Sequence, residues 1–176
     1  MTYGRISRLM HWAMAFLVIS AIALVEIKSL LPKGALKRDF MIWHIQAGIL
    51  VFILVWPRLL WRAANPAPPI RPPLKGLHRF SANLAHHALY FMMAALPIFG
   101  FLALESKGRA VHFFGLQLPV LIDEDKWLHY ALTLRHDHAL LGNILIGMIA
   151  LHLISAVLHH VLRQDDTLKR MLPWLK

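Results

Sequence analysis

The chain contains no cysteine among its 176 residues. Disulfides, thiolate ligands to a metal and iron–sulfur clusters held by this chain are therefore excluded. Charge is also scarce, because only 16% of the residues are charged whereas 58% are hydrophobic. Soluble domains carry about 25% charged residues, so this composition predicts a protein that exposes much of its surface to lipid.

The charge that is present is mostly of one sign, with 19 lysines and arginines against 9 acids and a formal net charge of +10. A basic excess can indicate a nucleic-acid partner. Here the basic residues alternate with apolar stretches, which is more typical of cytoplasmic loops than of a nucleic-acid surface. We therefore expect the lipid bilayer as a partner and no nucleic acid.

Four apolar stretches without formal charge cover residues 9–25, 40–57, 80–104 and 138–162. About 20 apolar residues cross a bilayer as a helix, and only helices or closed barrels satisfy the backbone in lipid. No strand alternation competes, so the sequence predicts an all-α integral membrane four-helix bundle that forms one domain over residues 1–176. The predicted parts are spans at 6–28, 39–62, 79–104 and 136–162, a cytoplasmic loop at 63–78, and periplasmic loops at 29–38 and 105–135.

The orientation follows from the basic residues of the connecting segments. The two ends of the chain and the connection between the second and third uncharged stretches together hold eleven basic residues and two acids, whereas the other side holds eight and seven. Because lysine and arginine excess marks the cytoplasmic side, both termini are predicted to be cytoplasmic. Arg5 and Arg8 before the first apolar stretch also fit a cleaved signal peptide, but that stretch is longer than a usual signal core, which favours an uncleaved span.

Twelve histidines are many for a small membrane protein, and an ionisable residue inside a span indicates function. His138 and His152 are close to four helical turns apart, so both project from nearly the same face about 21 Å apart along the axis. Because the spans alternate in direction, His11 lies at the level of His152, and His44 at the level of His138. A b-type haem takes one neutral imidazole on each side of its iron. The sequence thus predicts two haem b groups, an inner one held by His11 and His152 and an outer one held by His44 and His138.

Further residues could support these predicted ligands. Gly48 and Gly142 each follow a predicted ligand by one turn, where a small residue lets a porphyrin approach the backbone, although glycine also serves helix packing. His86, His159 and Arg8 are predicted to contact a haem propionate or a quinone. The alternatives are that His86 packs, that His159 anchors its helix at the interface, and that Arg8 only marks the topology.

Short motifs in all four spans are similar to those of one family. They are Met10-His11-Trp12, Trp43-His44, Tyr90 followed by Ala95–Gly100, His138, Ala150–His152, Leu158–His160 and, in the tail, Asp166–Pro173. With these motifs, the sequence resembles from end to end the bacterial cytochrome b561 family of four-helix dihaem proteins of the inner membrane. The resemblance implies haem ligation by His11, His44, His138 and His152. It also implies a superoxide oxidase-like activity, in which electrons pass from periplasmic superoxide through the haems to ubiquinone.

Three functions are compatible with this arrangement. The first is the superoxide:ubiquinone oxidoreductase, for which Lys107, Arg109, Lys126 and Arg135 of the outer loop would attract an anion and the run Asp123–Asp125 would repel one. The second is a cytochrome b anchor subunit that relays electrons for a separate dehydrogenase or hydrogenase, which predicts a partner redox subunit. The third, a histidine-lined divalent-metal transporter, is disfavoured because the uncharged stretches contain no carboxylate.

Overall fold

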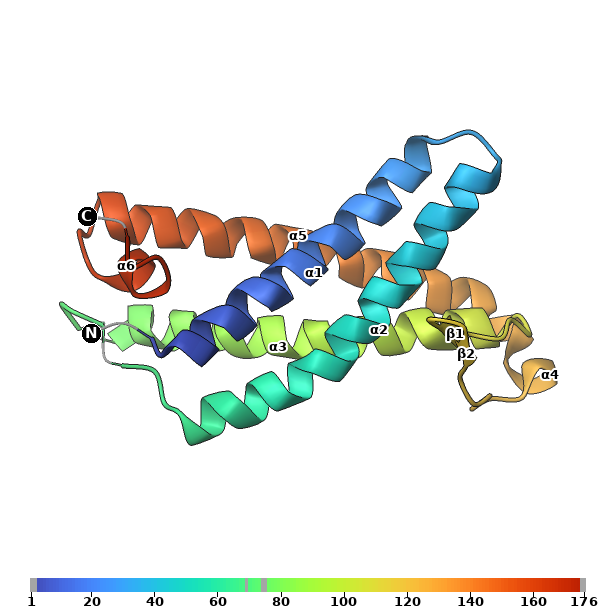
Figure 1. The fold of residues 1–176 in the computed structure, drawn as a ribbon, viewed down its shortest axis with the longest axis horizontal. Helices are drawn as coiled ribbons and strands as arrows, with labels where there is room; N and C mark the ends of the chain where they lie inside the picture. Colours follow the sequence, from blue (N-terminus) through green and yellow to red (C-terminus); the bar gives the residue numbers. More distant parts are fainter. Residues whose placement is uncertain (1–2, 69, 74–75, 175–176) are drawn as a thin grey trace.

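The computed structural model describes residues 3–68, 70–73 and 76–174. Residue 69 and residues 74–75 of the predicted cytoplasmic loop, together with both chain ends, lie outside the described residues. Each of four long helices is long and apolar enough to cross a membrane, which confirms the predicted all-α membrane four-helix bundle. These helices are α1 (Arg5–Leu30), α2 (Ala35–Ala64), α3 (Gly76–Glu105) and α5 (Ala131–Val161) (Figure 1).

The helices continue beyond the hydrocarbon region. The shortest has 26 residues and the longest of the four has 31, or roughly 39 to 47 Å at 1.5 Å per residue, against a hydrocarbon core about 30 Å thick. Lys28 and Arg62 accordingly lie in the last turns of α1 and α2. α5 begins five residues before the predicted start at 136, because its first turns carry Arg135 and Asp137 and extend outside the apolar stretch.

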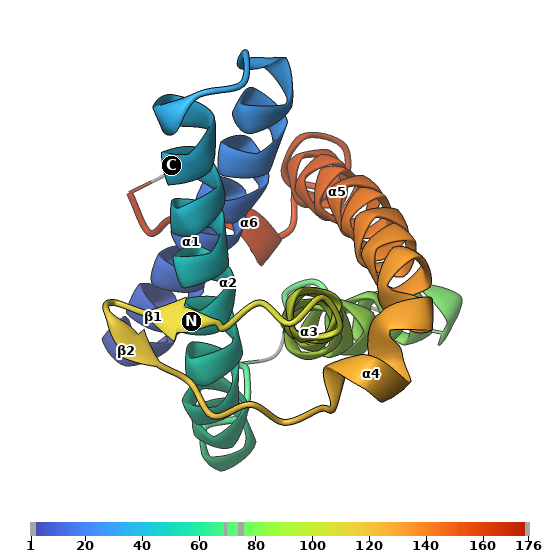
Figure 2. The ribbon, with the colours of Figure 1, turned by 90° about the vertical axis from the view of Figure 1, so that its right-hand side faces the viewer.

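Two antiparallel hairpins form the bundle. α1 packs along α2 across the short turn at residues 31–34, α3 packs along α5, and α2 lies against α3. The α1–α2 hairpin crosses over α3 and α5 at an angle (Figures 1 and 2). The first turn of α1 and the last turn of α5 lie at the same end of the bundle (Figure 1), as an even number of spans requires.

The buried core is contributed by all four helices. It consists of Met14, Val18, Val51, Val55, Met93 and Leu145. Along α5, Leu145 is seven residues from both His138 and His152, roughly 10 Å from each, so this apolar layer separates the two histidine levels. On the outside of the bundle large apolar side chains are exposed, with Phe16 at 71% and Leu151 at 68%. Such a surface fits a bundle that is surrounded by lipid.

The outer connection between α3 and α5 contains a small hairpin that the sequence did not predict. β1 (His112–Phe113) pairs antiparallel with β2 (Leu116–Gln117). Phe114 and Gly115 make the turn with φ values of 46° and 88°, a left-handed conformation that glycine adopts readily. Two residues per strand are too few to produce a period-2 pattern in the sequence.

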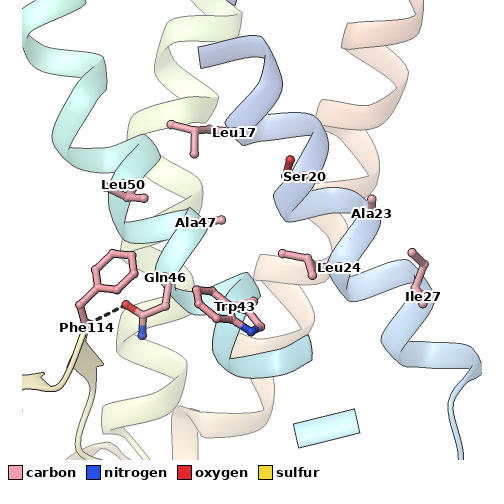
Figure 3. Close-up of a pocket in the computed structure, with 10 residues that line it drawn as sticks. All are labelled: Leu17, Ser20, Ala23, Leu24, Ile27, Trp43, Gln46, Ala47, Leu50 and Phe114. Atoms are coloured by element: carbon pink, nitrogen blue, oxygen red, sulfur yellow. Dashed lines mark hydrogen bonds between the residues drawn. The ribbon is translucent and has the colours of Figure 1, made fainter. Parts of the chain in front are cut away.

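Gln46, a buried polar residue of α2, holds this hairpin against the bundle. Its amide nitrogen donates to the His112 carbonyl at 2.9 Å. Its amide oxygen accepts from the Phe114 N–H at 2.9 Å (Figure 3). Beside it, an apolar cavity of about 470 Å³ lies between α1 and α2, lined by residues that include Leu24 and Trp43 (Figure 3). After the hairpin, two short elements lead into α5, namely α4 (Glu124–Trp127) and the 3₁₀ helix η1 (Leu128–Tyr130).

At the inner end, a short C-terminal helix folds back onto the bundle. This helix, α6 (Thr167–Met171), packs against α5. The indole nitrogen of Trp12 in α1 donates to the Met171 carbonyl at 3.4 Å. The loop between α2 and α3 is joined to the same segment, because the Arg71 N–H donates to the Asp166 carboxylate at 2.9 Å. The tail therefore connects three separate parts of the chain at the inner end.

Candidate functional site

At the outer level His44 of α2 lies opposite His138 of α5, with ring centroids 6.0 Å apart. Nδ1 of His44 is 2.8 Å from the Ala21 carbonyl oxygen, and Nδ1 of His138 is 3.0 Å from the Leu96 carbonyl oxygen. A carbonyl oxygen can only accept, so each Nδ1 carries the hydrogen and each Nε2 keeps its lone pair. Histidines that bind a metal through Nε2 have this tautomer, with Nδ1–H donating to a backbone carbonyl.

Gly100 of α3 lets the His138 ring take its position. A Cβ built on Gly100 would lie 2.9 Å from Cε1 of His138, closer than real Cβ contacts allow, and 3.1 Å from Nδ1 of the same ring. Gly48 and Gly142, which were predicted to make room for a porphyrin, have no atom within 4 Å of an added Cβ. Gly48 faces a cavity that also contains both outer histidines. The glycines at this level therefore have two different roles. Gly100 makes room for the His138 ring, whereas Gly48 borders the open cavity.

This outer cavity has a volume of about 590 Å³ and is lined by residues of α1, α2, α3 and α5 and of two outer loops. Cofactor and ligand pockets usually measure about 300–1,000 Å³. Apolar residues form much of the wall, and seven basic residues but no acidic residue complete it. The basic residues are Lys28, Lys33, Lys37, Arg38, Lys107, Arg109 and Arg135.

The acidic run of the outer loop lies apart from the cavity lining. Asp123 caps α4 by accepting from the Asp125 N–H at 3.1 Å and pairs with Lys126 at 3.1 Å on the exposed surface. The Glu124 carboxylate lies against Gly108, where a Cβ would clash with it. Of the four basic residues predicted to attract an anion, three line the cavity and Lys126 does not. The loop therefore divides its charges, with the cations at the cavity and the acids outside it.

At the inner level three histidines come together instead of two. The ring centroid of His152 is 6.5 Å from that of His11 and 5.8 Å from that of His86. The predicted pair is thus brought together, but the ring of His86, predicted to support the pair, lies closer to His152 than the ring of His11 does. Within the described part of the chain, no three His, Cys, Asp or Glu side chains converge as ligands of one metal ion.

Arg58 of α2 distinguishes the inner pair from the outer pair. Its Nη2 donates to Nδ1 of His11 at 2.9 Å, and its guanidinium lies 5.3 Å from the centre of the Tyr90 ring. Because a guanidinium only donates, Nδ1 of His11 is an acceptor and the ring hydrogen lies on Nε2. His11 can ligate iron through Nε2 with Nδ1 protonated only when Arg58 has turned away. The tautomers of the outer pair therefore suit metal ligation through Nε2, whereas that of His11 does so only after Arg58 moves.

Both histidine pairs fit the separation that one iron imposes. Imidazole nitrogens bind a transition metal at about 2 Å, so two rings on opposite sides of one iron have centres roughly 6 Å apart. The observed separations are 6.0 Å for the outer pair and 6.5 Å for the inner pair. At the outer level the apolar wall suits a porphyrin ring and the basic residues suit its carboxylates. The residues present therefore fit haem b.

The remaining predicted site residues lie at the inner end. Nδ1 of His159 is 2.6 Å from a carboxylate oxygen of Asp165, whose side chain is fully buried. Arg8 is half-buried, and its Nε is buried without a hydrogen-bond partner. His159 thus binds the tail of the chain. Contacts of His86, His159 and Arg8 with a propionate or a quinone stay predictions.

Several roles and contacts in these sites were not predicted. Gly100 stood only within a motif, and the contact between Arg58 and His11 joins residues 47 positions apart. The basic residues between Lys28 and Arg38 did offer a signal, because four basic residues within eleven positions are unusual on the outer side of a membrane. If these four basic residues had been interpreted as part of a site, the sequence would have predicted their position at the outer cavity.

The sequence matches the family described as prokaryotic cytochrome b561 over residues 2–174. It is 34% identical to the probable superoxide oxidase CybB of Yersinia pestis over 163 residues, which are 93% of this chain and 91% of that protein. Cytochrome b561 homolog 1 of Escherichia coli (strain K12) is 29% identical over 93% of this chain and 93% of its own length. Cytochrome b561 homolog 2 of the same organism is 31% identical over 97% of this chain and 90% of its own length. The chain therefore belongs to the prokaryotic cytochrome b561 family, whose members are multi-pass inner-membrane proteins that bind haem b and transfer electrons.

Proposed function

We propose that this protein is a dihaem superoxide:ubiquinone oxidoreductase. Each periplasmic superoxide gives up one electron and leaves as dioxygen, and two such electrons with two protons convert one ubiquinone to ubiquinol. When bound, each haem b supplies a centre that accepts and releases one electron at a time. The outer haem is assigned to His44 and His138 and the inner haem to His11 and His152.

The observation that carries this proposal is the presence of two histidine pairs at two depths. Their ring separations of 6.0 and 6.5 Å are compatible with two imidazoles on one iron. The backbone carbonyls behind the outer pair orient both Nε2 atoms for ligation. An apolar layer that contains Leu145 lies between the two levels.

Superoxide is supported as the donor by the charge of the outer cavity. Its lining contains seven basic residues and no acid, and a cleft with charges of one sign raises the association rate of a small ion by about 10- to 1,000-fold. The similarity to a protein named as a probable superoxide oxidase supports the same donor. The chain's part in the reaction is to bind and orient the haems, to separate them by an apolar layer, and to concentrate the anion.

Haem content tests the assignment of ligands. Purified wild-type protein should carry two b haems per chain, and His44→Ala and His152→Ala should each lose a different one. His87→Ala is the matched control, because His87 is exposed and its Nδ1 is bonded within its own helix at 2.7 Å. One haem in the wild type, or loss of the same haem in both variants, would contradict the dihaem assignment.

Stopped-flow reduction by superoxide, with and without ubiquinone, tests the activity. Arg135→Gln and Lys37→Gln remove cations from the outer cavity and should slow the second-order reduction, with a smaller dependence on ionic strength. Lys126→Gln removes a cation of the same loop that does not line the cavity, and should leave the rate unchanged. Equal rates for all variants would refute steering by the cavity. A chain that superoxide does not reduce, and that co-purifies with a dehydrogenase or hydrogenase, would favour the anchor subunit instead.

A further inference from the structure

Four side-chain atoms of the described residues are buried without a hydrogen-bond partner, and all four are at the inner end of the bundle. They are Arg8 Nε, His160 Nδ1, Thr167 Oγ1 and Arg170 Nε. Arg8 belongs to α1, His160 to α5, and the other two to α6, which packs on α5 and is bonded to α1. Buried polar atoms are nearly always paired, so four exceptions at one end of the bundle indicate a missing partner.

Arg170 is the most unusual member of this group. Only 3% of its surface is exposed, and its guanidinium lies 4.7 Å from the centre of the Tyr3 ring. Its polar contact is a hydrogen bond from Nη2 to the Pro68 carbonyl oxygen. No described carboxylate lies within salt-bridge distance of it. A guanidinium has five N–H donors, and a buried charge is costly unless it is paired.

The two neighbouring acids are already engaged elsewhere. Asp165 accepts from the Thr167 N–H at 3.0 Å and is bonded to His159, and its carboxylate lies 3.7 Å from Arg163. Asp166 accepts from the Arg71 N–H. Neither acid is bonded to the guanidinium of Arg170. The partner that Arg170 lacks must therefore come from outside these residues.

Arg8 connects this group to the inner histidines. It lies one turn before Trp12 on the same face of α1, since residues four apart in a helix share a face. The Trp12 indole donates to the Met171 carbonyl beside Arg170, and its ring centroid is 5.3 Å from that of His11. Trp12 thus lies between this unpartnered group and His11, which we assign to the inner haem.

We propose that Arg170 and Arg8, with Thr167 and His160, form a binding site for an oxyanion at the inner end of the bundle. All four side chains can donate hydrogen bonds, so the ligand that satisfies them is an acceptor with several lone pairs, a carboxylate or a phosphate. Its two sources are a propionate of the haem assigned to His11 and His152, in which case the inference rests on the proposed function, or the phosphate of an acidic phospholipid in the inner leaflet.

The variants Arg170→Gln and Arg8→Gln test this site in the full-length holoprotein. Arg79→Gln is the matched control, because Arg79 is an exposed arginine at the same end of the bundle. Two properties are measured: the midpoint potential of each haem, and the gain in thermal stability on transfer from phosphatidylcholine to phosphatidylglycerol nanodiscs. The haem that is lost in His152→Ala identifies the inner one. Arg8→Gln leaves the contacts of Arg170 with Tyr3 and Pro68 intact, and it decides the matter if Arg170→Gln does not fold.

A propionate in the site predicts that both variants lower the midpoint potential of the inner haem alone, because the carboxylate then favours the ferric state without its counter-cation. A lipid phosphate predicts unchanged potentials and loss of the stability gained in phosphatidylglycerol. Either result supports the oxyanion site. The site is refuted if both variants match Arg79→Gln in potential and in lipid response. That result would not affect the assignment of the haem ligands. The ligand assignment is refuted by a different result, namely that His152→Ala loses no haem.

Discussion

Replacement of Gly100 by alanine should weaken the outer haem site without affecting the inner one. The added Cβ would lie 2.9 Å from Cε1 of His138, whereas ordinary contacts begin at 3.4 Å. The ring or the helix must therefore shift by roughly 0.5 Å, and misfits of this kind in a packed interior typically cost about 1–3 kcal/mol. Such a shift also strains the 3.0 Å hydrogen bond between His138 and the Leu96 carbonyl.

Loss of a hydrogen bond that orients a metal ligand typically lowers metal affinity about 10- to 100-fold, or by about 1.4–2.7 kcal/mol. We expect that loss for the outer haem of Gly100→Ala. The assay is a haem titration of haem-depleted protein in a His152→Ala background, where only the outer site can fill. Gly147→Ala is the control, because it lies on the same helix as His138 and has no atom within 4 Å of an added Cβ. Wild-type affinity in Gly100→Ala, or an equal loss in Gly147→Ala, would refute the packing argument.

Three further predictions concern the ends of the bundle. Gln46→Leu leaves two hairpin backbone groups unpaired at about 1–3 kcal/mol each, so amide exchange in the hairpin should accelerate while haem content stays constant. Arg58→Gln removes a cation beside the inner pair and should lower only the inner haem's potential, by tens of millivolts for an interaction on the order of 1 kcal/mol. Burial opposes the charge of Asp165, but hydrogen bonds from Thr167 and His159 outweigh it and hold the pKa of this carboxyl below its ordinary 3.8. The stability that Asp165 adds is therefore complete above pH 3.8 and is lost as the pH falls through the lower pKa of the folded state. Proteolysis of the tail should accordingly increase only in strong acid. Asp165→Asn should remove this pH dependence.

The periodicity of charge and hydropathy along the chain determined the fold class and the depth of each histidine. A helix has a fixed rise and a bilayer a fixed thickness, so the position of His152 within an uncharged stretch already sets its level. The same arithmetic paired His11 with His152 and His44 with His138, and the structure brings both pairs within 6.5 Å.

Only the tertiary structure decided how the two levels differ. The carbonyls of Ala21 and Leu96 set the tautomers of the outer histidines, and Arg58 sets the opposite tautomer of His11. These contacts join residues between 23 and 47 positions apart, and their formation depends on the angle at which the helices cross. Hydropathy and helical spacing fix the height of a side chain in the membrane, but they do not fix the rotation and approach of neighbouring helices, which side-chain packing determines.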